Sequence, residues 1–413
     1  MIKRILFNKL KKHLAAKEIS LIVGPRQAGK TTLMKELLSF LQKEGAQTVF
    51  LNLDYESDKI HFSTQNSLIT KLQLELGSNK GYVFIDEIQR KENAGLFLKG
   101  IYDLELGYKF IVSGSGSLEL KEKIHESLAG RKRLFELNTV SFEEFVNYKT
   151  SYKYENNLKG FFKVEKEKTS QLLTEYMSFG GYPRVVIEES INEKIMIIDE
   201  IYRSYIEKDI SFLLKVDKTE AFTKMMKLLA AQVGTLLNYS VLAMNSGVSV
   251  PTIKKYLWYA EKTFIIKEVS PFFTNKLKEI TKAPTIYFND LGMRNYMIGA
   301  FGNLQNPTDT GLVFQNMMYN ILYEKYLFTP FSINYWRTID KAEVDFVIRK
   351  ALDLLPIEIK YSTFNKPVLT RSFHSFIEKY NPKEAFLVSC KYENDIKIKN
   401  TIVKFIPFYQ LMF

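Results

Sequence analysis

The sequence is poor in cysteine and has no long apolar run, and each absence excludes a class of protein. Cys390 is the only cysteine among 413 residues, so one chain can form neither an internal disulfide framework nor a cysteine-based metal site. No apolar run approaches the roughly 18 residues of a membrane span. The basic, amphipathic N-terminus lacks the apolar core and small-residue cleavage site of a signal peptide. These absences favour a cytoplasmic protein that makes no use of a membrane.

The composition is that of a folded, basic protein. Hydrophobic residues make up 46% and charged residues 25% of the chain, which is typical of globular domains and not of disordered chains. At this length we expect roughly two to four domains. The formal net charge is +12, which favours contact with something anionic, such as nucleic acid or a membrane surface. Lysines spread over a solvated surface would give the same balance, so composition alone does not decide.

Apolar strands alternate with amphipathic helices in the first 145 residues. Strand-like segments occupy residues 19–23, 48–53, 82–85 and 109–112, and helical spacing separates them. This alternation is typical of βαβ units that build a parallel sheet covered by helices on both faces. The sequence therefore predicts a doubly wound α/β domain at the start of the chain.

The pattern changes after this domain. Residues 150–172 are polar and rich in lysine and glutamate, which predicts a linker or an exposed loop. Residues 172–229 have helical spacing, broken at the Gly-Gly-Tyr-Pro segment 180–183. Residues 231–290 predict a helix-turn-helix followed by strands, and residues 307–413 predict a long helix followed by strands and a late helix.

A phosphate-binding motif follows the first strand. The segment from Gly24 to Thr31 matches G-x4-G-K-[ST] between a predicted strand and a predicted helix, which is the context of a P-loop. Glycines let successive N–H groups face the phosphates, and the helix N-terminus adds a positive dipole end. Lys30 is expected to reach the β- and γ-phosphates of ATP, and the Thr31 hydroxyl to ligate Mg²⁺. The expected nucleotide-binding residues are Gly24, Pro25, Arg26, Gln27, Ala28, Gly29, Lys30, Thr31 and Thr32.

Two carboxylates and a serine end the next predicted strands. Asp86 is expected to orient Mg²⁺ and its waters, and Glu87 to act as general base toward the attacking water. The presence of both carboxylates favours hydrolysis over binding alone. Ser113 ends the strand at 109–112 and is expected to lie between these carboxylates and the γ-phosphate as a sensor. A capped strand-helix turn would explain the same serine without any catalytic role.

A basic trio follows Gly130. Arg131, or Arg133 as second choice, could act as an arginine finger that compensates charge in the transition state across a subunit interface. Such a finger would require a homo-oligomer. A solvated or DNA-facing basic strand would have the same sequence.

The order of these motifs resembles the prokaryotic AAA+ ATPases that carry a C-terminal restriction-endonuclease-like domain of unknown function. The resemblance rests on the P-loop, the Ile-Asp-Glu-Ile-Gln segment, the Ser-Gly-Ser strand end, Leu-Ala-Gly-Arg and residues 137–145. Weaker matches are Gly-Gly-Tyr-Pro at 180–183 and Tyr-Phe-Asn-Asp-Leu-Gly at 287–292. The modules that this resemblance implies are an α/β AAA+ core at 1–150, a helical lid at 151–230, a winged-helix module at 231–300 and an α/β restriction-endonuclease-like domain at 301–413.

The middle region carries a local positive charge. Residues 241–282 hold seven lysines against three glutamates, a net charge of +4. Lys254 and Lys255 would lie on the second helix of the helix-turn-helix, which suits a winged helix on a phosphate backbone. A packing module with merely solvated lysines is the alternative.

The C-terminal segment carries a second set of chemically capable residues. Asp345 and Glu358 lie on successive predicted strands, as in restriction-endonuclease-like folds, and could hold a second Mg²⁺. Lys360 shares a strand face with Glu358 and could activate a water. Gln315 occupies the helix position where such folds often have an acid, and Glu324 lies further along that helix. A degenerate domain used for binding is therefore the alternative to a nuclease.

Three functions remain open at this point. The chain could be an ATP-driven machine that acts on DNA, or a nucleotide-dependent switch or scaffold that binds a protein partner. It could also be a metal-dependent nuclease regulated by ATP. All three use ATP and Mg²⁺ at the P-loop.

Overall fold

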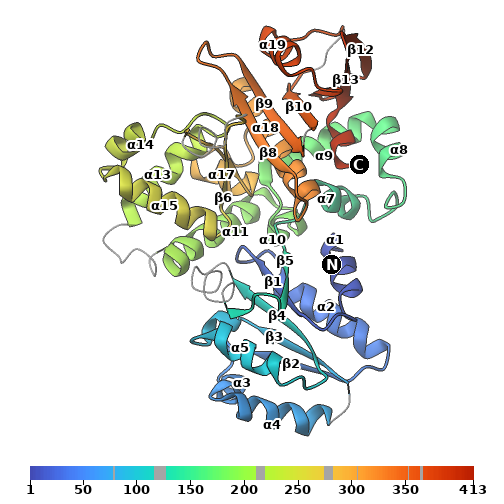
Figure 1. The fold of residues 1–413 in the computed structure, drawn as a ribbon, viewed down its shortest axis with the longest axis vertical. Coiled ribbons are helices and arrows are strands. Elements are labelled where there is room, and N and C mark those ends of the chain that lie inside the picture. Colours follow the sequence, from blue (N-terminus) through green and yellow to red (C-terminus); the bar gives the residue numbers. More distant parts are fainter. Residues whose placement is uncertain are drawn as a thin grey trace.

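The chain folds into an α/β domain and a larger part made of helices and a second sheet, seen at the bottom and top of Figure 1. In the computed structural model, the described residues contain sheets of five, six and two strands. They are residues 1–77, 80–115, 127–210, 219–273, 282–304, 306–351, 353–362 and 366–413. No helix among them is both long enough and apolar enough to cross a bilayer.

The first domain contains the predicted alternation of strands and helices. Its elements are α1 (Ile5–Lys12), β1 (Ile19–Gly24), α2 (Lys30–Lys43), β2 (Thr48–Asn52), α3 (Glu56–Lys59), η1 (Ile60–Phe62), α4 (Gln65–Leu76), β3 (Tyr82–Asp86), η2 (Ile88–Arg90), α5 (Ala94–Asp103), β4 (Lys109–Ser115) and β5 (Lys132–Glu136). The five strands are parallel in the order β2-β3-β4-β1-β5. The predicted parallel sheet is therefore confirmed.

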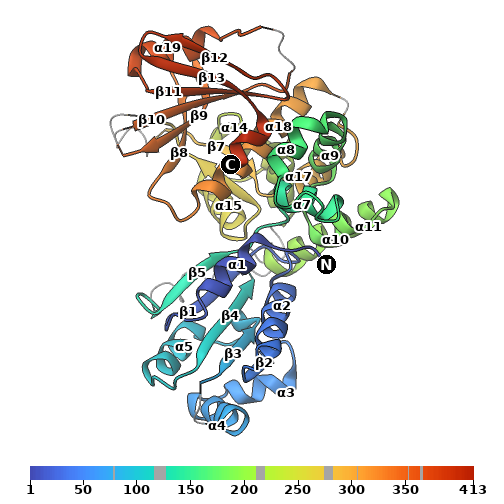
Figure 2. The ribbon, with the colours of Figure 1, turned by 90° about the vertical axis from the view of Figure 1, so that its right-hand side faces the viewer.

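Alternating side chains of this sheet pack into separate helical layers. Ile22 and Phe84 pack with α1 and α2, whereas Leu21 and Ile85 pack with α4 and α5. Figure 2 shows α2 on one side of the sheet and α5 on the other. Because both faces are covered, β1 is buried at every position and can be almost wholly apolar. This layering confirms the doubly wound prediction.

The middle of the chain is mainly helical. Its elements are α7 (Phe142–Lys149), α8 (Leu158–Val164), α9 (Lys166–Phe179), α10 (Pro183–Ile187), α11 (Ile191–Ser204), the π-helical η3 (Tyr205–Ile210), α13 (Thr219–Ala231), α14 (Tyr239–Ser246), α15 (Val250–Lys262), β6 (Ile266–Val269), β7 (Thr285–Phe288) and α17 (Leu291–Met297). The expected order of helix, turn, helix and strands is present as α14, α15, β6 and β7. A winged-helix role for this module remains a prediction.

The linker predicted at 150–172 is wrong. Helix α8 and the first half of α9 fill most of that segment. Leu158, Phe161 and Phe162 are buried in the largest hydrophobic cluster, and their burial outweighs the polar residues around them. The lysines and glutamates that suggested a linker lie mostly on the exposed side of these helices.

The C-terminal part is a mixed sheet with a helix on each face. Its elements are α18 (Pro307–Tyr326), β8 (Ser332–Arg337), β9 (Glu343–Lys350), β10 (Asp353–Ile359), α19 (Arg371–Tyr380), β11 (Glu384–Ser389), β12 (Asn394–Ile398), β13 (Thr401–Pro407) and η5 (Phe408–Met412). The strand order is β12-β13-β11-β10-β9-β8, antiparallel from β8 to β10 and parallel from β10 through β11 to β13. Phe346 packs toward α18, and Val347 packs toward α19.

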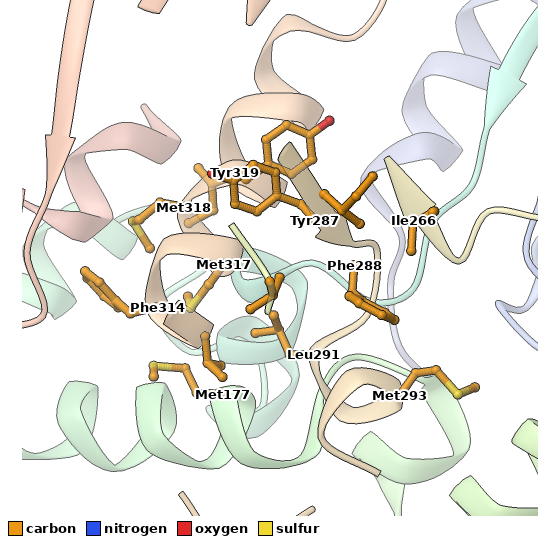
Figure 3. Packing of buried hydrophobic residues seen from close by; sticks show 14 of the residues in the cluster. Met177, Ile266, Tyr287, Phe288, Leu291, Met293, Phe314, Met317, Met318 and Tyr319 are labelled. Atoms are coloured by element: carbon orange, nitrogen blue, oxygen red, sulfur yellow. The ribbon is translucent and has the colours of Figure 1, made fainter. Parts of the chain in front are cut away.

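One hydrophobic cluster joins the helical region to this second sheet. It contains Ile2 and residues from Val140 to Leu411, among them residues of α9, α17, α18 and β10. Figure 3 shows Met177, Leu291 and Phe314 meeting in it. Segments on both sides of residues 230 and 300 thus share a core, and the predicted domain boundaries remain predictions.

Candidate nucleotide-binding site

The loop between β1 and α2 has the backbone of a phosphate cradle. Gly24 approaches the carbonyl of Leu137 so closely that an added Cβ would lie 2.0 Å from its oxygen. Gly29 precedes α2 with a φ of 95°, which favours glycine. No side chain caps α2, so its first N–H groups remain for a phosphate. The motif therefore needs glycine at both positions, because a side chain would clash at Gly24 and would strain the backbone at Gly29.

Lys30 and Thr31 lie where the motif predicts. Lys30 is buried, and its ammonium donates to the carbonyls of Gly24 and Pro25 at 3.1 and 2.8 Å. Thr31 Oγ1 donates to Asp86 Oδ2 at 2.7 Å. A bound triphosphate would offer the Lys30 ammonium charged oxygens, which make stronger hydrogen bonds than neutral carbonyls.

Asp86 is a shared acceptor at the end of β3. It is fully buried, and the Ser113 hydroxyl donates to its Oδ1 while Thr31 donates to its other oxygen. The Glu87 backbone N–H also points to Asp86 Oδ1, at 3.2 Å. The structure therefore brings the P-loop, the predicted metal ligand and the predicted sensor into one hydrogen-bonded group.

Glu87 is a half-buried carboxylate with a raised pKa. Burial raises the pKa of this carboxyl, Lys30 opposes the rise, and Asp86 adds to it. Its backbone is left-handed, with a φ of 57°, which turns the chain sharply at the strand end. Gln89, which sequence reasoning missed, donates its amide to Glu87 Oε2. A carboxylate with a raised pKa accepts a proton from water more readily.

A cavity of about 430 Å³ lies over the P-loop, within the usual range of about 300–1,000 Å³ for ligand sites. Its walls include the P-loop and Glu87 on one side, and Pro183, Arg184 and Ser204 on the other. Arg184 Nη1 lies 3.0 Å from both carboxylate oxygens of Glu200 and 3.3 Å from Gln27 Oε1. Sequence reasoning missed Arg184, although it directly follows the Gly-Gly-Tyr-Pro segment.

The two weaker sequence motifs meet behind Arg184. Asp290 is buried and accepts the Gly181 N–H at 2.8 Å and the Met293 N–H at 2.9 Å. An added Cβ on Gly181 would lie 2.2 Å from the Val140 carbonyl oxygen. Asp290 therefore fixes the turn from which α10 presents Arg184 to the cavity.

Comparison with known families now decides the class of the first domain. Residues 16–146 match the family model described as AAA domain. The first domain is an AAA domain. Residues 170–304 and 310–411 match two models, described as Domain of unknown function (DUF8612) and Domain of unknown function (DUF4143). The match of the AAA domain agrees with the P-loop geometry.

Similar proteins span most of the chain. An uncharacterized protein of Mycobacterium tuberculosis is 25% identical over 371 residues, covering 89% of this chain and 75% of that protein. An uncharacterized protein of Methanocaldococcus jannaschii is 23% identical over 413 residues, covering 96% of this chain and 88% of that protein. Among solved structures, the Aeropyrum pernix ORC1 protein in complex with DNA has a TM-score of 0.30 and 12% identity, over 70% of this chain and 90% of that chain. AMPPCP-bound DnaA from Aquifex aeolicus has a TM-score of 0.24 and 15% identity, over 62% of this chain and 86% of that chain.

Arg131 directly precedes β5, at the end of the AAA domain sheet opposite the P-loop. Its neighbour Lys132 pairs with Ile19 at the start of β1, about five residues, or roughly 16 Å, from the P-loop. Arg131 instead holds Asp103, with Nε 2.7 Å from Oδ1. Neither Arg131 nor Arg133 can thus serve the P-loop of its own chain. An arginine finger supplied to a neighbouring chain remains a prediction.

The C-terminal residues are brought together as predicted. Lys360 Nζ lies 2.9 Å from Glu358 Oε1, and the Ile359 N–H donates to Asp345 Oδ2 at 2.6 Å. Gln315 Nε2 donates to Asp345 Oδ1 at 3.0 Å. Glu324 lies beside Arg4 and Glu144 instead, so Gln315 is the residue of α18 that reaches this cluster.

These residues fit a hard cation. Glu358 is 4% exposed, and its Oε2 is buried without a hydrogen-bond partner among the described residues. Burial, together with the neighbouring charge of Glu358, raises the pKa of Asp345. A divalent cation would satisfy the orphaned oxygen and offset the repulsion between the carboxylates. The described residues hold no cluster of three or more His, Cys, Asp or Glu side chains.

The lysines of the helix-turn-helix are exposed. Lys254 Nζ lies 5.4 Å from the ring centre of Tyr239, and Lys255 Nζ lies 5.6 Å from that of Tyr259. Lys276, Lys278 and Glu279, which contributed to the predicted charge, lie outside the described residues. Contact of this module with DNA remains a prediction.

Proposed function

We propose that the AAA domain binds ATP with Mg²⁺ and hydrolyses it. The observation that carries the proposal is the hydrogen bond from the Thr31 hydroxyl to Asp86. Thr31 lines the same cavity as Lys30 and Glu87. Thr31 and Asp86 would hold Mg²⁺, which neutralises phosphate charge when it is bound. The family match of residues 16–146 supports the same function.

Each residue has a role in this reaction. Lys30 would bind the β- and γ-phosphates in place of the loop carbonyls that it now contacts. Glu87 would accept a proton from the water whose oxygen attacks the γ-phosphorus. The bond between that phosphorus and the bridging oxygen breaks, and ADP and phosphate leave. Arg184, on the opposite wall, would add positive charge beside the γ-phosphate.

Separate binding and turnover assays test this proposal. Lys30→Ala should weaken ATP binding and abolish turnover. Glu87→Gln should retain ATP binding and lose about 100-fold or more in turnover, because general bases contribute about 10²–10⁴-fold. The exposed Glu92 makes Glu92→Gln the matched control. Turnover at the wild-type rate in Lys30→Ala would refute the assignment.

The task that hydrolysis drives is proposed to involve DNA. The net charge of +12 and the exposed Lys254 and Lys255 support this partner. ATP turnover should rise when duplex or single-stranded DNA is added, and fall back in a Lys254→Met, Lys255→Met double variant. If DNA does not change the rate of ATP turnover and nucleotide changes the assembly of the protein, a protein-binding switch would be favoured instead.

A second candidate activity is metal-dependent phosphodiester cleavage at Asp345 and Glu358. The orphaned Glu358 oxygen beside Lys360 favours it. Cleavage of DNA or RNA in Mg²⁺ or Mn²⁺ should disappear in Asp345→Asn and persist in Asp353→Asn, whose carboxylate is exposed on the next strand. Manganese binding without cleavage would identify a degenerate domain, and absence of both would refute the metal site.

A further inference from the structure

An aromatic cavity of about 240 Å³ lies at the C-terminal end of α18. Tyr319, Tyr323 and Tyr326 line it from α18, and Phe328 and Phe331 line it from the loop before β8. The volume is about eight times the roughly 30 Å³ that a water molecule occupies in the liquid. Flat rings can therefore enter this aromatic cavity.

Phe328 presents its ring to solvent. It is 61% exposed, and its φ of 63° puts a bulky residue in the left-handed region, which such residues rarely adopt. Thr329 holds the turn, with its N–H and its hydroxyl both donating to the Tyr326 carbonyl, at 3.0 and 2.7 Å. An exposed aromatic ring held in this way beside other rings is typical of an interaction surface.

Lys350 lies near these rings, whereas Lys325 of α18 donates its ammonium to the Leu411 carbonyl at 3.1 Å. Lys350 Nζ lies 5.6 Å from the ring centre of Tyr326 and 5.5 Å from that of Phe331. Neither Lys350 nor Lys325 forms an ion pair with a carboxylate among the described residues. Burial and the charge of Lys350 lower the pKa of Lys325, so the two ammonium groups repel each other. An anionic partner would relieve this repulsion.

Two carboxylates also face the rings and restrict where an anion can lie. Glu136 of the AAA domain accepts the Tyr323 hydroxyl at 3.0 Å and pairs with Lys267 at 3.4 Å. Glu261 of α15 acts through its charge on Tyr319. Phosphates are therefore expected at Lys350, beside Tyr326 and Phe331, and neutral bases are expected over the rings.

A series of side-chain contacts links the aromatic cavity to the Asp345 cluster. Tyr319 stacks on Tyr287, with ring centres 4.5 Å apart, and Gln315 links the Tyr287 hydroxyl to Asp345. Gln315, Tyr319, Tyr323 and Tyr326 follow helical spacing and so share one face of α18. The distance from Gln315 to Tyr326 is roughly 16 Å along the helix.

We propose that the aromatic cavity binds single-stranded nucleic acid. Unpaired bases would stack on Tyr326, Phe328 and Phe331, and the backbone phosphates would contact Lys350. Rings combined with cations bind unpaired bases without reading their sequence, whereas a duplex keeps its base faces stacked inside. The inference requires neither ATP hydrolysis nor metal binding, because it rests on α18, the loop before β8 and β9.

Anisotropy of a fluorescein-labelled 20-nucleotide oligo-dT tests the proposal. The full chain is titrated without nucleotide and with EDTA, so failure of the ATPase or of the metal site leaves the result readable. Phe328→Ala should weaken binding about 5- to 100-fold, since one stacked base contributes about 1–3 kcal/mol. Lys350→Met should weaken binding and reduce the slope of log affinity against log salt by about 0.7.

Matched variants control for surface changes. Leu74→Ala removes an 83% exposed apolar side chain from α4, and Lys397→Met removes an exposed charge from β12, at the opposite edge of the sheet from β8. Both should bind oligo-dT like the wild type. Circular dichroism melts confirm that each variant is folded.

Three outcomes would overturn the proposal. The first is no binding of oligo-dT at low salt. The second is binding that neither Phe328→Ala nor Lys350→Met changes, or that a duplex of equal length matches, either of which would place nucleic acid elsewhere. The third is tight binding of an apolar peptide that Phe328→Ala weakens and that salt and Lys350→Met leave unchanged.

Discussion

The guanidinium of Arg4 lies 2.9 Å from the carboxylate of Glu144 and also donates to the P-loop carbonyl of Ala28 at 2.8 Å. It further donates to the carbonyls of Asn138 and Thr139, at 2.7 and 3.1 Å. Both side chains of the ion pair are nearly inaccessible to solvent. A residue near the N-terminus thus braces the nucleotide loop against the segment that follows β5.

Arg4→Met should lower the free energy of unfolding by about 3–5 kcal/mol, because it leaves Glu144 buried without its counter-charge. The neighbouring variant Lys3→Met removes an exposed pair with Glu155 and should leave the free energy of unfolding almost unchanged, because solvent screens exposed ion pairs. Urea denaturation followed by circular dichroism measures both. Equal losses in the two variants would contradict the role given to Arg4.

His13 should make the free energy of unfolding depend on pH below about pH 6.5. Burial, with the charge of Lys109 as the next cause, lowers the pKa of His13 to about 4. An unfolded histidine takes up its proton near pH 6.5, so between about pH 6.5 and 4 the unfolded chain binds more protons. The stability that His13 contributes is therefore complete above pH 6.5 and is lost as the pH falls toward 4.

His13→Gln should flatten the dependence of unfolding free energy on pH in that window, by up to about 1.4 kcal/mol per pH unit. His374→Gln, at a half-exposed histidine of α19, is the matched control for loss of a histidine. Urea midpoints at pH 4.5, 5.5 and 6.5 measure the slope. An unchanged slope in His13→Gln would refute the assignment.

Cys390 should be an unreactive thiol in the folded protein. Burial raises the pKa of its thiol to about 11, beside Phe162 and Tyr361 in a small cavity. Since only the thiolate reacts, and its share falls tenfold per pKa unit, Ellman's reagent at pH 8 should react about 100-fold more slowly than with an exposed cysteine. Ser57→Cys in a Cys390→Ser background supplies that exposed thiol. Similar rates for the two proteins would contradict the burial of Cys390.

Two glycine substitutions should have opposite effects. Gly181→Ala places a Cβ 2.2 Å from the Val140 carbonyl oxygen and should cost about 1–3 kcal/mol. Gly311 lies within α18, where an added Cβ would meet no atom within 4 Å. Gly311→Ala should therefore raise the free energy of unfolding by about 0.5–1 kcal/mol. Denaturant midpoints measure both, and Gly181→Ala should also weaken ATP binding because the turn before Arg184 shifts.

The P-loop and the Asp86–Glu87 pair could be predicted because short spacings encode them and each follows an apolar strand. Arg184 could not, since its contact Gln27 lies 157 positions away and only the packing of α10 joins them. The position of Arg131 could not be predicted either, because a run of basic residues does not show at which end of the sheet it lies.

The C-terminal cluster, too, could be predicted only in part from the sequence. Glu358 and Lys360 share a face because strands alternate with period two, and this could be read from their spacing. The bond from Gln315 to Asp345 depends on how α18 packs against β9, which no local pattern encodes. The wrong linker prediction arose because many charged residues outnumbered a few buried ones, such as Phe161 and Phe162.

The brace formed by Arg4 also has a consequence for synthesis. Arg4 and Glu144 are 140 positions apart, and ribosomes add about 5–20 residues per second. Arg4 of a nascent chain therefore waits roughly 7 to 28 seconds for Glu144 to be added. The carbonyls of Asn138 and Thr139 emerge equally late, so the brace can form only after the P-loop, Asp86 and Ser113 have emerged, and before Arg184 completes the cavity wall.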